Sequence, residues 1–571
     1  MKKLIISTCL LVILIPSIAS PEDLPVVKDD GRAAAVASES QAYLEFILGY
    51  EAEITNKWDD ALAHYFKAME ADPGALELRT RVAQMLIRLG RTKEALEQFE
   101  RIGAEKPDYV PALLTLGELY NSQKQTDKAI GVYERILKLD PERKEPYLFL
   151  GALYSAQGKE KKARAILDTL LAKDPDNIMA LYSVGSLYLK KKDFPKAKEY
   201  FRKAVEINPQ FDTGYVSLAV IGEMTSDLKS AEENYTKALE LNPNNLSVRE
   251  RLAQLYVSDR SYKKAIEELE TLLAQVPENL DLHMRLGMLY LQEREFDKAI
   301  SELRLVADAL PNDTTSRFYI GVALEELKRY PEAIAQFKGI LAIDPKHFSS
   351  FMNLGFIYAK TDHVEDAVKV YEEVLSFEKG KSEVYAYLGN AYIQTKQYDK
   401  AEAVLKDAAA RFKDNDEILF TTAVLYEKMH RFDDMVSYLR KTIAANPKHA
   451  DALNYLGYSF ADKGINLKEA LSLVERALEL KPDSGYMIDS LGWVYFKMGR
   501  LDEALALMNK AAAMVKDDPV LFEHLGDIQA ARGKTDAALA AWQESLKYEQ
   551  KEEGLKTRVE EKINTLQSKT K

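Results

Sequence analysis

A proline that returns every 34 residues is the feature that most constrains how this chain can fold. The series runs through Pro73, Pro107, Pro141, Pro175, Pro209, Pro243, Pro277, Pro311 and Pro345. The same step then reaches Lys379, Lys413 and Pro447, becomes 35 residues to Pro482, and returns to 34 at Lys516. A fixed period of this length indicates stacked supersecondary units instead of several ordinary domains. The extra residue lies near positions 463–466, between two expected helices.

Three further positions repeat in the same phase. A small residue stands at Gly49, Ala83, Gly117, Gly151, Gly185, Ala219, Ala253, Gly287, Gly321, Gly355, Gly389, Ala423, Gly457, Gly492 and Gly526. Twelve or thirteen residues later comes an alanine, replaced once by Met435: Ala61, Ala95, Ala129, Ala163, Ala197, Ala231, Ala265, Ala299, Ala333, Ala367, Ala401, Ala470, Ala504 and Ala538. Four residues beyond each of these lies a large apolar side chain, such as Tyr133, Phe337 or Trp542.

These marks have a mechanical interpretation. A small residue on one helix and an alanine on the next allow two helices to pack closely, and the large residue one turn later lies on the same face as the alanine. The proline cannot continue the second helix, so the chain turns there and begins another hairpin. One such hairpin cannot bury its own apolar stripe, but a stack of hairpins can. We therefore treat the large in-phase residues as core.

This pattern resembles the tetratricopeptide repeat, as Gly117, Tyr120, Ala129, Tyr133 and Pro141 illustrate. The resemblance implies an all-α fold, a right-handed superhelical α-solenoid of about fifteen hairpins over residues 42–552, with a polar capping helix or tail at 553–571. The departures from the family pattern are Lys379, Lys413 and Lys516 for proline, Met435 for alanine, and Gln529 where tyrosine is common.

The N-terminus has the layout of a secretory signal peptide. Lys2 and Lys3 precede an apolar stretch over residues 4–19, which ends in Ser17-Ile18-Ala19. We expect cleavage after Ala19, a flexible segment over residues 20–41, and a periplasmic or otherwise exported product. The alternatives are a retained membrane anchor, for which the stretch is short, and a lipoprotein modified at Cys9. Membrane association is expected only through partners or an uncleaved leader.

Composition and motifs favour a binding protein over an enzyme. The formal net charge of −12 disfavours nucleic acid as a partner, because acidic surfaces repel phosphates. The seven histidines show no metal-ligand spacing, and Cys9 is the single cysteine. Only 60 residues lie outside the repeats, too few for a catalytic domain. We expect no catalytic residue, no metal and no cofactor.

The family resemblance also implies which residues contact partners. In tetratricopeptide proteins the first helix of each hairpin faces the concave groove, near its second, fifth, ninth and twelfth positions. Transferred to this chain, that gives Arg81, Gln84, Tyr182, Gln254, Arg285, Phe318, Met352, Phe356, Tyr387, Asn390, Asn454, Tyr458, Asp489 and Trp493. Aromatic and amide side chains are good anchors in binding surfaces. The family's lysine–asparagine clamp for a terminal carboxylate does not occur at these positions.

The last repeats suggest a function more specifically. The segments 452–458, 489–495 and 523–527 are similar to the end of a bacterial family of envelope tetratricopeptide proteins. One branch binds a periplasmic carboxyl-terminal processing protease and presents cell-wall hydrolases to it. The resemblance implies an extracytoplasmic adaptor that binds other proteins or peptides in its groove. The alternative is a structural component of envelope biogenesis, secretion or polysaccharide export.

Overall fold

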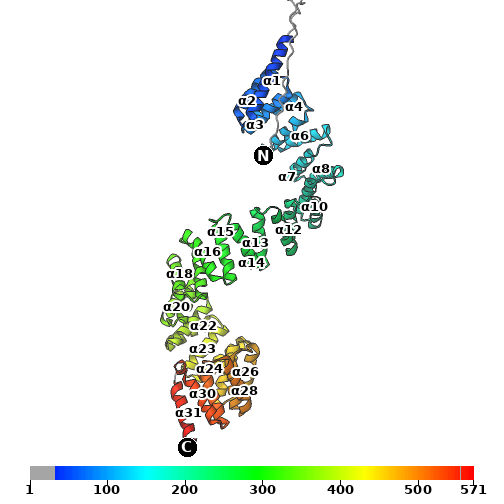
Figure 1. Cartoon of the computed structure of the whole chain (residues 1–571). Coiled ribbons are helices and arrows are strands. Elements are labelled where there is room, and N and C mark those ends of the chain that lie inside the picture. The colour runs from blue at the N-terminus through cyan, green and yellow to red at the C-terminus, as the bar shows by residue number, and fades with distance from the viewer. Residues whose placement is uncertain (1–31, 553, 571) are drawn as a thin grey trace, which may run out of the picture. The chain divides into compact units, whose positions relative to one another are not determined.

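The computed structural model describes residues 32–552 and 554–570, and these residues form helices and turns without any strand. Two α-helices occupy each 34-residue period, and a further helix follows the last one (Figure 1). The predicted all-α solenoid of helical hairpins is confirmed. The chain divides into two compact units, residues 1–259 and 260–571, which are described separately.

The first unit contains the helices of the first six repeats and the first helix of the seventh. Its helices are α1 (Arg32–Ile54), α2 (Trp58–Ala71), α3 (Leu76–Arg88), α4 (Thr92–Glu105), α5 (Val110–Ser122), α6 (Thr126–Leu139), α7 (Glu145–Ala156), α8 (Glu160–Lys173), α9 (Ile178–Lys190), α10 (Phe194–Ile207), α11 (Asp212–Met224), α12 (Leu228–Leu241) and α13 (Leu246–Ser258).

The second unit continues the series to the C-terminus. Its helices are α14 (Tyr262–Leu273), α15 (Leu280–Gln292), α16 (Phe296–Ala309), α17 (Thr314–Glu326), α18 (Tyr330–Ile343), α19 (Phe348–Lys360), α20 (Val364–Phe377), α21 (Ser382–Gln394), α22 (Tyr398–Arg411), α23 (Asp416–Lys428), α24 (Phe432–Ala445), α25 (Ala450–Lys463), α26 (Leu467–Leu480), α27 (Gly485–Lys497), α28 (Leu501–Met514), α29 (Pro519–Ala531), α30 (Thr535–Leu546), the short 3₁₀ helix η1 (Glu549–Lys551) and α31 (Leu555–Thr570).

Side chains at the helix starts explain where many first helices begin. Asn177, Asn279 and Asp518 each immediately precede a helix, and each accepts a hydrogen bond from a backbone N–H in its first turn. This satisfies a donor that would otherwise lack an intrahelical partner. Pro175 and Pro277, two residues before Asn177 and Asn279, prevent the preceding second helix from continuing. Turn and cap together therefore fix the period.

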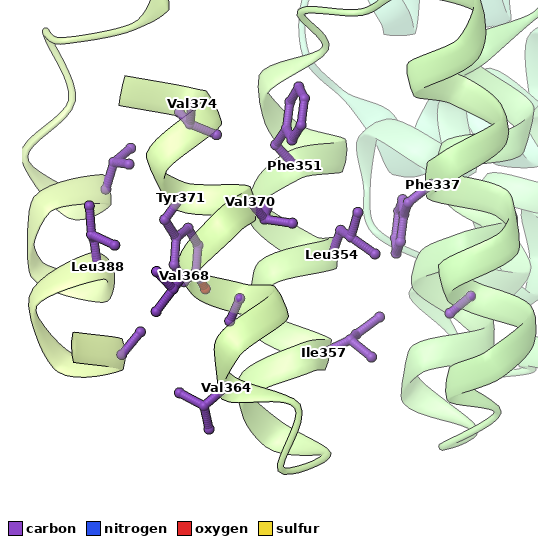
Figure 2. Close-up of a cluster of buried hydrophobic side chains, with 14 of the residues drawn as sticks. Phe337, Phe351, Leu354, Ile357, Val364, Val368, Val370, Tyr371, Val374 and Leu388 are labelled. Carbon is purple, nitrogen blue, oxygen red and sulfur yellow. The ribbon is translucent and has the colours of Figure 1, made fainter. Parts of the chain in front are cut away.

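The core of the second unit lies between the paired helices, and Figure 2 shows part of it. Phe337 and Tyr371, two of the large in-phase residues, are buried with 0% and 1% exposure. Phe351 and Leu354 of α19 pack into the same cluster from the facing helix. The interpretation of these in-phase residues as core agrees with their burial.

Consecutive repeats are also joined by a recurring hydrogen bond between a tyrosine and a glutamate twenty residues earlier. Tyr120 donates to Glu100 at 2.7 Å in the first unit, and Tyr392 donates to Glu372 in the second. Burial first, and then the neighbouring carboxylate, raise the pKa of Tyr120 to about 12, which keeps the phenol protonated as a donor. The bond links a second helix to the first helix of the next repeat.

Two glycines of the ninth repeat are expected to respond to alanine in opposite directions. A Cβ on Gly321 would lie 2.7 Å from Cε1 of Phe337, whereas one on Gly339 would meet nothing within 4 Å. Gly321→Ala should therefore destabilise the second unit by about 1–3 kcal/mol through overpacking. Gly339→Ala should stabilise it by about 0.5–1 kcal/mol, because alanine is the better helix former. Urea unfolding followed by circular dichroism measures both, and shifts of the same sign would contradict the expectation.

Helix α1 begins before the expected first repeat. The sequence placed residues 20–41 in a flexible segment, but residues 32–41 are helical. The alanines at 33, 34, 35 and 37 favour helix, and Ser38 donates a hydrogen bond to the Ala71 carbonyl at 2.6 Å. The boundary is therefore corrected to Arg32. The expected signal peptide and residues 20–31 lie outside the described residues, and no helix among those described is long and apolar enough to span a membrane.

The extra residue of the thirteenth repeat is accommodated in the turn between α25 and α26. Gly464 and Asn466 both adopt positive φ, at 70° and 47°. Glycine and asparagine are the residues that tolerate this region best. The insertion therefore lengthens the turn and leaves α26 with the same length as the other long second helices, and Ala470 and Val474 stay buried.

Candidate functional site: the first-helix face of the last four repeats

The fourteen groove residues implied by the family differ in their exposure. Gln84, Gln254, Phe356 and Tyr387 are exposed, and Arg81, Tyr182, Arg285, Phe318, Met352, Asn390, Asn454 and Tyr458 are half-buried. Asp489 and Trp493 are buried, with 8% and 5% exposure. We use the term first-helix face for the surface that these groove positions form along the first helices of the hairpins. Partner binding by these residues stays a prediction, and the burial of Asp489 and Trp493 leaves little of their side chains for a partner to contact.

Several of the candidates pack against the core. The ring of Phe318 lies 5.8 Å from that of Phe337, and Tyr387 stacks on Tyr371 at 5.7 Å. Tyr182 contacts Phe201 at 5.5 Å in the first unit. These side chains therefore contribute to stability as well as to the surface, which is typical of large residues that cover a helix contact.

In the first unit, Arg81 and Gln84 line a small pocket of about 260 Å³ beside Glu53. Arg81 Nε lies 3.2 Å from Glu53 Oε2, and Tyr65 donates to the same carboxylate at 2.6 Å. Burial first, then the hydrogen bond to Glu53, raise the pKa of Tyr65 to about 12. This pocket is occupied by an internal ion pair, so it offers a partner little free charge.

Four candidates of the second unit lie on α25 and α27, next to α29: Asn454, Tyr458, Asp489 and Trp493. Asp489 of α27 and His524 of α29 form a buried hydrogen bond of 3.0 Å. The Trp493 ring stacks on His524 with centroids 3.8 Å apart, and Tyr458 of α25 lies 6.0 Å from the same imidazole. One histidine therefore connects three successive first helices. His524 was not among the candidates, although it stands at the same repeat position as the candidates Arg81, Arg285 and Tyr387.

A cavity of about 330 Å³ opens beside this cluster, between α23, α24 and α25. We call it the α23–α25 pocket. Its walls include Glu427, Phe432, Met435, Tyr455, Tyr458 and Asp462. Met435 is the residue that replaces the repeat's alanine, and Ser459 Oγ lies 4.0 Å from its sulfur. The pocket therefore lies where the hairpin contact departs from the repeat pattern.

The carboxylates around Tyr458 make this part of the first-helix face strongly acidic. Burial first, and then the charges of Asp462, Asp489, Glu523 and Glu552, raise the pKa of Tyr458 above its usual range. Burial and the neighbouring Glu427 do the same for Tyr455. Both phenols therefore remain neutral hydrogen-bonding groups among negative charges.

Helix α31 supplies the cations that neutralise the far end of this face. Arg558 donates to both carboxylate oxygens of buried Glu523, at 2.8 Å from Nε and 2.7 Å from Nη2. Lys562 bridges Glu523 and Asp527 of α29, at 2.6 Å each. On the apolar side, Leu555 and Val559 pack against Trp542 of α30. The C-terminal helix thus docks on the last repeat through two basic residues one turn apart.

No group of three or more potential metal-ligating side chains occurs within residues 32–552 and 554–570. The histidines that are buried, His283 and His524, each contact one carboxylate, Glu302 at 2.6 Å and Asp489 at 3.0 Å. His283 also contacts the Pro277 carbonyl at 2.9 Å. Such pairs fix the imidazole between neighbouring helices, as a packing role requires.

Comparisons with known proteins agree with this architecture. Models described as tetratricopeptide repeat match residues 55–119, 120–184, 178–211, 225–275, 256–317, 364–419, 420–485 and 490–552. The chain belongs to the tetratricopeptide repeat family. Proteins of this family generally mediate protein–protein interactions and bind other proteins or peptides.

The individual relatives match this tetratricopeptide repeat protein over a small part of the chain or at low sequence identity. A TPR repeat-containing protein of Pseudomonas aeruginosa is 39% identical over 84 residues, which is 15% of this chain and 14% of that protein. Among solved structures, the Naa15/Naa10 complex bound to HypK-THB has a TM-score of 0.37 at 18% identity, over 76% of this chain and 67% of that one. The APC/C hetero-tetramer Cut9–Hcn1 has a TM-score of 0.38 at 13% identity, over 92% and 98%.

Proposed function

We propose that this tetratricopeptide repeat protein is an extracytoplasmic adaptor that binds partner proteins on the first-helix face of α23, α25, α27 and α29. The observation that supports this most is the α23–α25 pocket of about 330 Å³, lined by aromatic rings and carboxylates. Pockets of this size with a few polar groups are common ligand sites. The signal-peptide pattern of residues 1–19 supports export.

The similarity of the last repeats to envelope adaptors suggests one class of partner. We propose that the protein binds a periplasmic carboxyl-terminal processing protease and presents cell-wall hydrolases to it. A preformed scaffold suits such a role, because it loses little conformational freedom when it binds. The adaptor itself needs no catalytic group for this function.

Affinity capture from an envelope extract tests the proposal. We expect Tyr458→Ala to reduce the amount of captured partner about tenfold, which corresponds to the loss of ~1.4 kcal/mol at an aromatic anchor. Ile343→Ala is the control, because Ile343 is 39% exposed at the end of the second helix α18. It should capture as much as the unaltered protein. Circular dichroism melting of each variant shows whether the fold is retained.

The identity of the captured proteins separates the two functional hypotheses. A protease with its substrates supports the adaptor, whereas secretion or polysaccharide-export proteins support a structural role in envelope biogenesis. Equal capture by Tyr458→Ala and the unaltered protein would contradict binding at this face.

A further inference from the structure

We propose that the α23–α25 pocket binds the cationic side chain of an arginine or lysine in a partner peptide, between the carboxylates of Glu427 and Asp462 and the rings of Tyr455, Tyr458 and Phe432. This inference rests on the proposed function and specifies the chemistry of the partner at that site.

The first argument is the charge of the walls. Glu427 and Asp462 contribute carboxylates from two neighbouring first helices. Both residues lie in the last turn of their helices, α23 and α25, where the helix dipole adds further negative potential. Two carboxylates and two helix C-termini therefore converge on one cavity, and such a site favours a cation.

Three basic side chains lie at this pocket: Lys463 and His430 are among its lining residues, and Lys428 pairs with Glu427. Lys428 Nζ is 3.2 Å from Glu427 Oε2, and Lys463 Nζ lies 5.6 Å from the centre of the Phe432 ring. Both lysine side chains are exposed. Exposed pairs of this kind contribute little energy and exchange readily with solvent. His430, in the turn after α23, is also exposed. A partner's cation can therefore compete for the inner carboxylate oxygens.

The second argument is the aromatic lining. A guanidinium or ammonium group is attracted to the faces of aromatic rings, and more strongly where the site is desolvated. Tyr455, Tyr458 and Phe432 supply three rings around the cavity. A volume of about 330 Å³, room for roughly ten water molecules, accommodates one long side chain with some of its hydration.

The third argument comes from the chain itself. On the same acidic face, Glu523 and Asp527 receive Arg558 and Lys562 of α31 at 2.6–2.8 Å. This is an example of how the first-helix face recognises a basic segment. The α23–α25 pocket presents the same carboxylate chemistry two repeats earlier, and within the described part of the chain its lining residues come from α23, α24, α25 and the turn after α23.

Fluorescence anisotropy with a labelled glycine-flanked arginine peptide tests the inference. The matched probe carries citrulline, which has the shape of arginine but no charge. We expect the full chain to bind the arginine peptide at least tenfold more tightly at low salt, with the preference weakened at 0.5 M NaCl, where screening is strong. A lysine version of the peptide distinguishes planar guanidinium recognition from recognition of charge alone.

Two double variants test whether the preference for arginine over citrulline depends on the carboxylates of the pocket. Glu427→Gln with Asp462→Asn should abolish the preference for arginine over citrulline. Glu417→Gln with Asp433→Asn, an equal change of charge at exposed positions of α23 and α24, should preserve it. Equal binding of the two peptides by the unaltered chain would overturn the inference, as would an unchanged preference in the pocket variant with an unchanged melting temperature.

The outcome is separable from that of the proposed function. If envelope partners are captured but the chain shows no preference for the arginine peptide, the adaptor function is supported and the proposed chemistry of the pocket is contradicted. An arginine preference without any captured partner would support the pocket chemistry and count against the adaptor.

Discussion

Phe337→Ala is expected to lower the free energy of unfolding of the second unit by about 3–5 kcal/mol. The Phe337 ring is completely buried between α17 and α18, where it fills the space left by Gly321. Truncation removes the apolar contact and leaves a cavity that neighbouring rings such as Phe318 fill only in part. Guanidinium chloride unfolding followed by circular dichroism measures the loss.

Phe356→Ala is the matched control for this substitution. Phe356 is the same residue type in the next repeat, but it is 43% exposed on the first-helix face. Its replacement should change the free energy of unfolding by no more than about 0.5 kcal/mol. Comparable losses for the two variants would show that burial at the in-phase position is not what stabilises the hairpin.

Glu523→Ala is expected to release α31 from the last repeat. The Glu523 side chain is buried, and its loss leaves Arg558 and Lys562 without their shared carboxylate. Because Arg558 is itself 43% exposed, water compensates part of the loss, and we expect a cost of about 2 kcal/mol to the docking of α31. Hydrogen exchange over residues 555–566 and Trp542 fluorescence report the release.

The docking of α31 should also depend on pH. Burial opposes ionisation of Glu523, but the hydrogen bonds from Arg558 and Lys562 outweigh it, so its pKa lies below the usual value. A carboxylate with a depressed pKa stabilises the folded state fully above its unfolded pKa of about 4.3, and this contribution is lost as the pH falls through the folded pKa. Protection of α31 should therefore persist at pH 5 and fall below about pH 4.

Glu560→Gln provides the control for both measurements. Glu560 lies on α31 itself and is exposed. The substitution removes one negative charge from the same helix without touching α29, so the protection of α31 and its pH dependence should remain. Release of α31 in this variant would indicate that the net charge of the helix, and not the buried contact with Glu523, holds it in place.

The 34-residue period was enough to predict the helical hairpins and their core residues. Proline at the junctions and alanine on the second helices located each hairpin, and the in-phase residues Tyr133 and Phe337 are fully buried. The start of α1 was placed too late, because the repeat phase says nothing about helix that extends before the first repeat. Its alanines were the available signal.

The candidate site was predicted less completely. Repeat position indicates which side of a first helix a residue faces, but it does not show what the next repeat places over it. Asp489 and Trp493 face the expected side and are nevertheless buried, because His524 of the following first helix covers them. The contacts of α31 were also missed. Glu523 with Asp527, and Arg558 with Lys562, each stand four residues apart, a complementary spacing that the sequence did contain.

The tyrosine–glutamate bonds between consecutive repeats bear on how proteins of this kind change in length. Since each bond joins position pairs that recur every 34 residues, duplication or loss of a whole period restores the same partners on both sides of the junction. A single inserted residue within a helix would instead rotate everything beyond it by about 100° and separate those partners. Changes in length should therefore accumulate in whole periods, and smaller ones only in turns such as residues 464–466, where positive φ angles absorb them.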